Sequence, residues 1–434
     1  MNFFRVTSIL AVMVISGCGK MLHKSSNGVK STSPAAPPWT AMGTGMDGDD
    51  DKTTEVKALT TDSAGNVYAG GSFTIAGGVA ANYIAKWNAA TSTWQAMGTG
   101  MSGSVTALTT DSSGNVYAGG IFSAAGGVSA NYIAKWNAAT STWTAMGTGM
   151  NGSVTALTTD SAGNVYAGGY FTCAGGSESS GDIPGNTCAG TGGVTALNGI
   201  AKWSAATSTW QAMGSGLNSY VEALTTDSAG NVYAGGAFRC AGGSKSSGYI
   251  PANTCAGTGG VTVLNGIAKW NAATSTWTAV GTGIGGNDSV DALTTDSSGN
   301  VYAGGVIHTA GGVSADSVAK WNAATSTWTA MGTGSKGMNG AGVTALTTDA
   351  LGIVYAGGSF TISGGAVADS VAKWNAATST WTAMGTSKGM NGGSVKALTT
   401  DALGIVYAGG SFTIAGGVAA GGVAAHYIAK WTGH

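Results

Sequence analysis

Fourteen tryptophans recur along this 434-residue chain and divide it into seven similar units. Six copies of the sequence WNAATSTW or WSAATSTW each carry two of them, with six residues between the two. These copies hold the pairs Trp87/Trp94, Trp136/Trp143, Trp203/Trp210, Trp270/Trp277, Trp321/Trp328 and Trp374/Trp381. The other two, Trp39 and Trp431, lie near opposite ends of the chain, so they form a seventh pair only if the chain closes on itself.

A second segment, ALTTD, gives the length of the repeat. It begins once in each of units one to seven, at Ala58, Ala107, Ala156, Ala223, Ala292, Ala345 and Ala397. Consecutive starts are 49, 49, 67, 69, 53 and 52 residues apart. Tandem units of this length stack into one continuous core, and an apolar fraction of 43% supplies the side chains to fill it. We therefore expect one repeat domain over residues 39–434.

Each unit carries four short segments typical of strands. In unit two these are VTALTTD at 105–111, NVYAGG at 115–120, YIAKWN at 132–137 and TWTAMGT at 142–148. Gly114 suits the left-handed position of a tight hairpin between the first two. If Trp136 lies opposite Trp143, the last two form a hairpin with a two-residue turn at Ala139 and Thr140. Each unit is predicted to be a four-stranded antiparallel sheet, with the tryptophans as structural residues.

The two ends of the chain indicate how the sheets are arranged. The last unit, from Val395 to Trp431, supplies three strands and no fourth. The segment PPWTAMGTGM, at about residues 37–46, is an isolated copy of the missing strand. Pairing it with the last unit removes two open sheet edges. We therefore predict an all-β fold, namely a seven-bladed β-propeller of four-stranded antiparallel blades that the N-terminal strand closes.

One family resemblance is visible in these repeats. The doublet Gly70-Gly71, followed by an aromatic residue at Trp87 and a second tryptophan at Trp94, resembles a kelch repeat. The segment DSSGNVYAGG is also similar to repeats of other bacterial secreted propellers. The resemblance covers residues 39–431 and recurs seven times, although the first aromatic of the family is usually tyrosine. It implies the propeller fold, and kelch propellers serve many functions.

The N-terminal residues indicate export. Residues 1–17 contain one basic residue, Arg5, and an apolar run from Val6 to Ile15, which is too short for a mature transmembrane helix. This stretch resembles a bacterial lipoprotein signal peptide, which implies that Cys18 becomes the acylated first residue. An ordinary secretory signal is the alternative. Residues 18–38 are polar, end in prolines and suit a flexible linker. We expect an envelope protein, and Gly19 resembles the sorting signal for the outer membrane of a Gram-negative host.

The other cysteines agree with an oxidising compartment. They fall in two corresponding insertions, as the pairs Cys173/Cys188 and Cys240/Cys255. Both pairs have the same spacing, and neither insertion contains a histidine, so two local disulfides are favoured over a metal site. Each bridge would close a loop of about 15 residues, for which chain entropy gives roughly 3 kcal/mol.

Comparison of the seven units separates constant from variable connections. The two hairpin turns within a unit, such as DSSGN and NAATST, change little. The loop after the Gly-Gly doublet and the connection between units change in nearly every unit, and we expect both on one face. Recognition is usually carried by such loops on a rigid scaffold, so the candidate ligand-binding residues are Tyr170, Tyr220, Arg239, Tyr249 and His308. Arg239 and His308 replace the threonine that recurs at their position.

An acidic cluster occupies the first variable connection. Asp47, Asp49, Asp50 and Asp51 could offer oxygen ligands to calcium. Their spacing matches no EF-hand loop, so a solvated acidic loop is the alternative. No other cofactor is expected.

Composition and residue inventory weigh against nucleic acid and against catalysis. The net charge of −1 supplies no basic field for nucleic acid. Some kelch-type propellers are copper oxidases, but only His308 and His426 lie within the repeats away from the chain terminus. The recurring aspartate of ALTTD is expected to be a turn residue in every unit, so it offers no glycosidase pair. We predict a monomeric, lipid-anchored scaffold that binds a protein or glycan. A kelch-type enzyme, either an oxidase or glycan-active, and a purely structural envelope protein are the alternatives.

Overall fold

The computed structural model describes residues 39–48, 53–175, 195–242, 255, 262–286, 288–332, 338–363, 366–384, 389–416 and 422–433. Residues from Pro37 to His434 form one compact unit. The predicted signal peptide at 1–17, the acylated Cys18 and the linker at 18–38 lie outside the described residues. Within the described residues, every regular element is a β-strand, and no helix is long and apolar enough to cross a membrane. The all-β prediction is therefore confirmed.

Each of the seven units forms a four-stranded antiparallel sheet, to which unit six adds a short fifth strand. The sheets of units one to three are β3 (Val56–Thr61), β4 (Val67–Gly71), β7 (Ile84–Asn88) and β8 (Thr93–Ala96); β9 (Val105–Thr110), β10 (Val116–Gly120), β13 (Ile133–Asn137) and β14 (Thr142–Ala145); and β15 (Val154–Thr159), β16 (Val165–Gly169), β19 (Ile200–Ser204) and β20 (Thr209–Ala212). Those of units four and five are β21 (Val221–Thr226), β22 (Val232–Gly236), β25 (Ile267–Asn271) and β26 (Thr276–Ala279); and β27 (Ser289–Thr295), β28 (Val301–Val306), β31 (Val318–Asn322) and β32 (Thr327–Ala330). Those of units six and seven are β33 (Met338–Thr348), β34 (Val354–Ser363), β36 (Val371–Asn375) and β37 (Thr380–Ala383), with β35 (Ala366–Val367) beside β34; and β39 (Val395–Thr400), β40 (Val406–Gly410), β43 (Ile428–Trp431) and β1 (Trp39–Ala41).

The last sheet combines the two ends of the chain. Strand β1 pairs with β43 in antiparallel register, with Trp39 opposite Trp431 and Thr40 opposite Lys430. The two indole rings lie edge to face at 5.3 Å between centroids, the same distance as for Trp87 and Trp94 in unit one. The predicted pairing of the N-terminal segment with the last unit is therefore confirmed.

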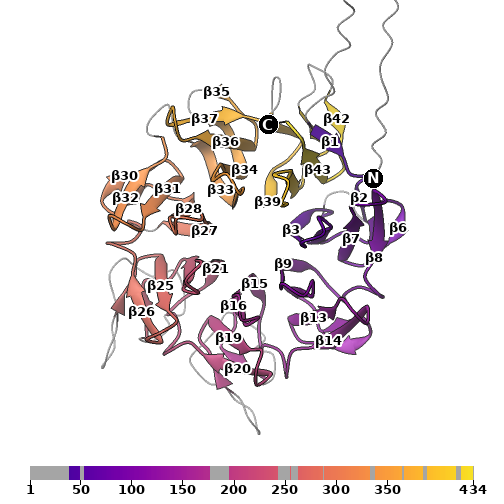
Figure 1. Ribbon diagram of the computed structural model, residues 1–434, viewed down its shortest axis with the longest axis horizontal. Helices are drawn as coiled ribbons and strands as arrows, with labels where there is room; N and C mark the ends of the chain where they lie inside the picture. Colours follow the sequence, from indigo (N-terminus) through magenta and orange to yellow (C-terminus); the bar gives the residue numbers. More distant parts are fainter. Residues whose placement is uncertain are drawn as a thin grey trace, which may run out of the picture. The chain divides into compact units, whose positions relative to one another are not determined.

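Two sets of hydrogen bonds connect each sheet to the next. In the first set, a threonine hydroxyl near the end of each first strand donates to the backbone carbonyl of the equivalent threonine in the preceding unit, over 2.9–3.1 Å. The bonds run from Thr110 to Thr61, Thr159 to Thr110, Thr226 to Thr159, Thr295 to Thr226, Thr348 to Thr295, Thr400 to Thr348 and Thr61 to Thr400. The last of these links unit one to unit seven. In Figure 1 the first strands correspondingly lie innermost and the fourth strands outermost.

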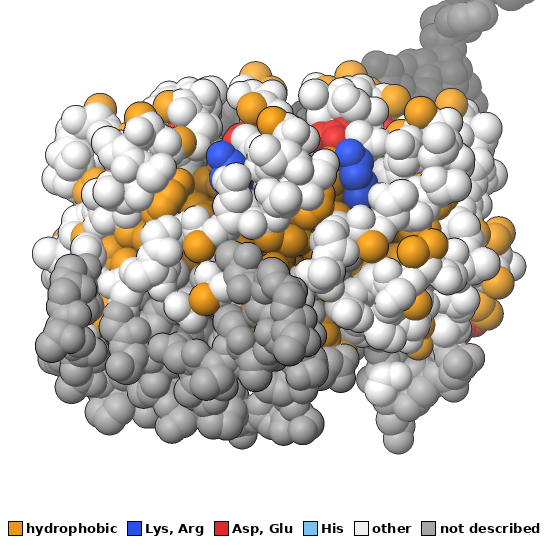
Figure 2. Space-filling model, turned by 90° about the horizontal axis from the view of Figure 1, so that it is seen from below, with side chains coloured by type: hydrophobic (Ala, Val, Ile, Leu, Met, Phe, Trp, Pro, Cys, Tyr) orange, Lys and Arg blue, Asp and Glu red, His pale blue; other side chains and the backbone are white. Residues whose placement is uncertain are grey.

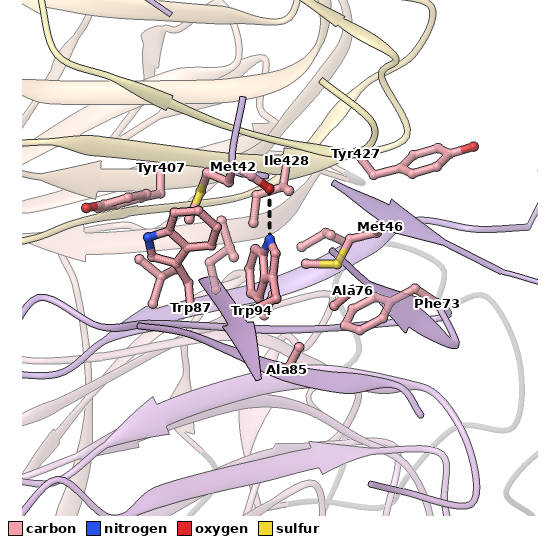
Figure 3. Packing of buried hydrophobic residues seen from close by; sticks show 14 of the residues in the cluster. Met42, Met46, Phe73, Ala76, Ala85, Trp87, Trp94, Tyr407, Tyr427 and Ile428 are labelled. Atoms are coloured by element: carbon pink, nitrogen blue, oxygen red, sulfur yellow. Dashed lines mark hydrogen bonds between the residues drawn. The ribbon is translucent and has the colours of Figure 1, made fainter. Parts of the chain in front are cut away.

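The second set uses the second tryptophan of each pair. Its indole Nε1 donates to a backbone carbonyl of the preceding unit over 2.6–2.9 Å. The seven bonds run from Trp94 to Met42, Trp143 to Met97, Trp210 to Met146, Trp277 to Met213, Trp328 to Val280, Trp381 to Met331 and Trp39 to Met384. Figure 3 shows the first of them, with Trp87, Met46 and Phe73 packed around the indole. The tryptophans therefore join neighbouring sheets as well as the two strands of a hairpin.

The Gly-Gly doublet is required by packing. A Cβ on Gly70 would collide with the side chain of Val105 on the next first strand, and a Cβ on Gly71 would collide with the carbonyl of Glu55 at the bulge beside it. Glycine at position 70 therefore lets adjacent sheets approach closely, and glycine at position 71 leaves room for the bulge within its own sheet.

The hairpin between the third and fourth strands differs from the prediction. In unit two the expected register is present, with Lys135 opposite Thr144 and Trp136 opposite Trp143. The connection, however, has four residues, 138–141, rather than two. Asn137 accepts the backbone N–H groups of the second and third of these through its side-chain oxygen, and Ser141 takes a left-handed φ of 53°. The asparagine cap stabilises a longer turn than the pairing alone requires.

The aspartate of ALTTD is a turn residue, as predicted. In unit one the carboxylate of Asp62 accepts the backbone N–H groups of Ala64 and Asn66 and the hydroxyl of Tyr68. Burial, followed by the charge of Asp62, raises the pKa of Tyr68. The Nζ of Lys86 lies 5.5 Å from the centre of the same ring. On the side of the molecule in Figure 2, charged side chains are few, and the blue and red ones lie beside one another.

Candidate functional site

The two variable connections of each unit lie against each other. In unit one β2 (Met46–Asp47) pairs with β5 (Ile75–Ala76), which pairs with β6 (Val79–Ala80). The same place holds β11 (Ala124–Ala125) with β12 (Val128–Ser129), β17 (Cys173–Ala174) with β18 (Thr195–Ala196), β23 (Cys240–Ala241) with β24 (Thr262–Val263), β29 (Thr309–Ala310) with β30 (Val313–Ser314), and β38 (Met390–Asn391) with β41 (Ile414–Ala415) and β42 (Val423–Ala424). Single bridges such as Met101 to Ala125 join the unit connection to these ribbons. Both variable connections therefore share one face, as predicted, and we call it the variable face.

The repeated threonine position on this face is held through its backbone. In unit three the side-chain oxygen of Asn151 accepts the N–H groups of Thr172 and Cys173 at 2.9 Å. Asn218 caps Arg239 and Cys240 in the same way in unit four, at 2.9 and 3.0 Å. The connection between units thus fixes the backbone while the side chain at this position is free to differ.

Arg239 uses its guanidinium to join units four and five. Its Nη2 donates to the backbone carbonyls of Gly286 at 2.8 Å and Asp288 at 3.1 Å, both in the next connection. These bonds give the residue a structural role in the contact between units. Ligand contact by Arg239 stays a prediction.

His308 lies against the same connection. The carboxylate of Asp288 accepts the backbone N–H of His308 and also lies 2.7 Å from its Nδ1. The side chain of His308 is 80% exposed, whereas that of Asp288 is 6% exposed. The hydrogen bond and charge of Asp288 raise the pKa of His308 above its ordinary value. The structure therefore brings Arg239 and His308 together at Asp288, and leaves the imidazole accessible.

Tyr170 and Tyr220 form a separate group. Their rings stack at 4.0 Å between centroids with an interplanar angle of 24°. The hydroxyl of Tyr170 donates to Oε1 of Glu222, which is two residues beyond Tyr220. Tyr170 lies in the loop after a Gly-Gly doublet, and Glu222 lies on the first strand of unit four, β21. This contact therefore connects the variable face to the interior.

Glu222 is one of seven residues at one register position of the first strands. Each follows the valine of the motif V-x-ALTT, and together with the ALTT alanines and leucines they line an open cavity of about 200 Å³. In the order of the units these residues are Lys57, Thr106, Thr155, Glu222, Asp291, Thr344 and Lys396. The cavity wall is therefore acidic in units four and five and basic in units seven and one.

The threonines and the charged residues of this cavity behave differently. The hydroxyls of Thr106, Thr155 and Thr344 donate over 2.6–2.7 Å to a valine carbonyl of the following first strand. The carboxylates have no proton to donate when ionised. Asp291 instead accepts the hydroxyl of Ser289 at 2.8 Å.

Burial raises the pKa of both cavity carboxyls. For Glu222, burial is the main cause, and the charge of Asp291 adds to it, while the hydrogen bond from Tyr170 acts in the opposite direction. For Asp291, burial again outweighs the hydrogen bond from Ser289. Two carboxyl groups with perturbed pKa values in one cavity are a candidate binding site.

On the basic side, Lys57 and Lys396 differ in their neighbours. The Nζ of Lys57 lies 3.3 Å from Oε1 of Glu55. Lys396 forms no ion pair with any residue in the described part of the chain. No salt bridge between described residues crosses the cavity to Glu222 or Asp291.

The sequence interpretation did not include this cavity. Alternation along the first strand places these side chains on one face of the strand, but it does not show that seven such faces surround one cavity. The signal was the order Lys, Thr, Thr, Glu, Asp, Thr, Lys at a position whose neighbours hardly change.

The remaining predicted residues are described only in part. Cys240 and Cys255 form a disulfide, as predicted. Cys173 is also disulfide-bonded, and its predicted partner Cys188 lies outside the described residues. Tyr249 lies outside them as well.

The predicted calcium ligands remain untested. Asp47 is exposed, and its carboxylate accepts the backbone N–H of Gly48 at 2.8 Å. Asp49, Asp50 and Asp51 fall outside the described ranges. Among the residues that are described, no three histidine, cysteine, aspartate or glutamate side chains group as metal ligands would.

Comparisons with known proteins identify a shared fold and no family. No protein-family model and no curated protein matches the chain. One similar solved structure is the extracellular domain of a putative hybrid two-component system from B. thetaiotaomicron, with a TM-score of 0.53 and 10% identity over 91% of this chain and 40% of that chain. Another is the extracellular domain of a putative one-component system from the same organism, with a TM-score of 0.55, 10% identity and coverage of 91% and 39%. This chain thus spans about two fifths of the length of these neighbours, and at such low identity the likeness concerns the fold alone.

Proposed function

We propose that the chain is an exported, lipid-anchored, seven-bladed β-propeller of the kelch type that binds a protein or glycan ligand without catalysis. The contact that carries the binding proposal is the one from Tyr170 to Glu222, because it joins exposed aromatic surface on the variable face to a charged cavity behind it.

The propeller assignment is supported by the hydrogen bonds between units. Seven threonine bonds and seven tryptophan bonds each form a complete cycle, and the bonds from Thr61 to Thr400 and from Trp94 to Met42 link the first and last units. Such closure leaves no sheet interface open, as in a propeller. The kelch assignment rests on the sequence resemblance.

Export is supported by the disulfide between Cys240 and Cys255, since disulfides persist in oxidising compartments. The lipid anchor at Cys18, the outer-membrane location and the monomeric state rest on the sequence.

Binding at Tyr170 and Tyr220 is supported by how these positions vary between units. The position of Tyr170 is serine in units one, six and seven, at Ser72, Ser359 and Ser411. The position of Tyr220 is serine in units two, three, five and seven, at Ser104, Ser153, Ser289 and Ser394. The scaffold therefore accepts serine at both positions. Folding does not require the stacked tyrosine pair that units three and four contribute. Stacked rings with an accessible edge suit a sugar or a protein side chain.

The test uses these serines. Wild type and the variant Tyr170→Ser/Tyr220→Ser are applied to a glycan array and to pull-downs from envelope extracts, and the Kd of each ligand found is measured. Loss of binding by at least tenfold in the variant is expected. The control is Ile121→Ser, which introduces serine at the equivalent exposed position of unit two. Equal binding by wild type and the tyrosine variant, or an equal loss with Ile121→Ser, would contradict the proposed site.

A second candidate function follows from the carboxyl pair. Glu222 and Asp291 line one cavity with raised pKa values, and glycosidases use a pair of such groups. We favour binding because Tyr170 and Ser289 already occupy the two carboxyls with hydrogen bonds. Hydrolysis of an array glycan by wild type, abolished in Glu222→Gln, would establish the enzyme instead.

A further inference from the structure

The central cavity presents charges of opposite sign on opposite walls. Going around the first strands, β21 and β27 carry Glu222 and Asp291, while β39 and β3 carry Lys396 and Lys57. One threonine strand, β33, separates Asp291 from Lys396, and two, β9 and β15, separate Lys57 from Glu222. The acidic and basic pairs therefore face each other across the cavity.

These charges are not neutralised by each other. Glu222 and Asp291 receive hydrogen bonds from the uncharged hydroxyls of Tyr170 and Ser289. Lys57 has Glu55 nearby, and Lys396 has no acidic partner among the described residues. A partly desolvated charge without a counter-ion is costly, so the cavity favours a guest that brings both missing charges.

Folding does not require charge at this position. Units two, three and six carry threonine there, and each threonine makes a hydrogen bond to the following strand that a carboxylate cannot make. The four charged residues thus replace a side chain that connects neighbouring strands. A role in binding accounts for this replacement.

We propose that the central cavity binds a small zwitterion, a molecule with one ammonium group and one carboxylate. The ammonium group lies between Glu222 and Asp291, and the carboxylate lies at Lys396. This inference rests on the proposed propeller closure and binding function, and it names a ligand class for the cavity.

The size of the cavity agrees with such a guest. A cavity of about 150 Å³ holds benzene, and this one measures about 200 Å³. A free amino acid or a short ω-amino acid therefore fits.

The experiment is isothermal titration of the full chain in detergent with glycine, 4-aminobutanoate and 6-aminohexanoate, which differ in the spacing of their two charges. Butanoate and butylamine serve as probes with one charge each. At least one zwitterion is expected to bind at least tenfold more tightly than either of these. Failure of all three zwitterions to bind, or equal binding of the single-charge probes, overturns the proposal.

Two variants then test the two walls. Glu222→Thr/Asp291→Thr and Lys396→Thr introduce the residue that other units already carry at this position, so the fold is retained. Each is expected to weaken zwitterion binding at least tenfold, because a hydrogen bond to a charged group is lost. Lys86→Thr, which removes a lysine on β7 outside the cavity, is the matched control and leaves binding unchanged. Unchanged binding in either cavity variant refutes the inference.

The outcome is separable from that of the proposed function. If no zwitterion binds, and Tyr170→Ser/Tyr220→Ser still weakens glycan or protein binding, the cavity inference is refuted and the proposed function stands. Zwitterion binding without any ligand on the variable face removes the proposed surface and keeps the cavity.

Discussion

Replacing Trp39 by alanine tests whether the N-terminal strand carries as much of the fold as a strand in the interior of the sequence. The side chain of Trp39 is 1% exposed, its Nε1 donates to the Met384 carbonyl at 2.6 Å, and its ring contacts Trp431. Trp94 has the same environment in unit one, with 5% exposure, a 2.8 Å bond to Met42 and a ring contact with Trp87.

The magnitude follows from burial. Truncation of a buried tryptophan to alanine costs about 3–5 kcal/mol, including the cavity left behind. The free energy of unfolding should therefore fall by about 3–5 kcal/mol in both Trp39→Ala and Trp94→Ala. Trp39→Phe retains most of the burial, and should lose less, since it mainly leaves the Met384 carbonyl without its donor.

The assay is urea denaturation followed by circular dichroism, with wild type and the three variants measured at one protein concentration. Near-equal losses for the two alanine variants are expected. A loss below about 1 kcal/mol for Trp39→Ala beside a full loss for Trp94→Ala would refute the reasoning, because it would mean that β1 contributes little to the last sheet.

Four further outcomes are expected. Glu222→Thr should raise the free energy of unfolding at pH 7 by about 1 kcal/mol, measured by urea denaturation, because the new hydroxyl can donate to the next strand as Thr155 does. The pKa of Glu222 is raised on folding, so wild type should lose stability as pH rises above about 4.5, and the loss should be smaller in Glu222→Thr. The same pH dependence of stability in wild type and Glu222→Thr would contradict this prediction. Asp288→Asn should lower the pKa of His308 towards 6.5 in an NMR titration of the ring carbon, and no shift would contradict the contact. Since the pKa of His308 is raised on folding, the stabilisation from its pair with Asp288 is complete below about pH 6.5 and is lost as pH rises through the raised pKa. The melting temperature of wild type should therefore fall over this pH range relative to that of Asp288→Asn. A melting temperature that does not fall relative to the variant would contradict this prediction.

The sheets and their closure could be predicted because the repeat supplies its own alignment. A count of tryptophans leaves Trp39 and Trp431 without local partners, and only one pairing satisfies both. The register of Trp136 and Trp143 was also readable, since strand residues alternate between faces.

The small two-stranded ribbons on the variable face were not predicted, although the sequence indicates their turn by the doublet Gly77-Gly78. Gly77 and Gly78 take φ values of 57° and 80°, which is the backbone of a two-residue hairpin between β5 and β6. The two strands are only two residues long, too short for alternation to be recognised.

The candidate site was predicted in part. Tyr170 and Tyr220 were predicted as ligand-binding residues in or near the variable loops, and the structure stacks them together. A shared site for Glu222 and Asp291 could not be predicted from the sequence, because polar residues are common on the solvent-facing side of a strand. Only the arrangement of the first strands around one cavity gives these carboxyls a shared environment.

The closure of the chain by its N-terminal strand is the claim on which the account depends, and a disulfide trap tests it most directly. Thr40 and Lys430 lie directly opposite in the β1–β43 register. In Thr40→Cys/Lys430→Cys, mild oxidation should link the two cysteines in nearly all molecules, as identified by mass spectrometry of the joined peptides. The control is Thr40→Cys/Lys86→Cys, because Lys86 occupies the equivalent position in unit one and pairs with Gln95. A crosslink in the first variant and none in the control is the predicted result; the absence of a crosslink between positions 40 and 430 would contradict the closed arrangement.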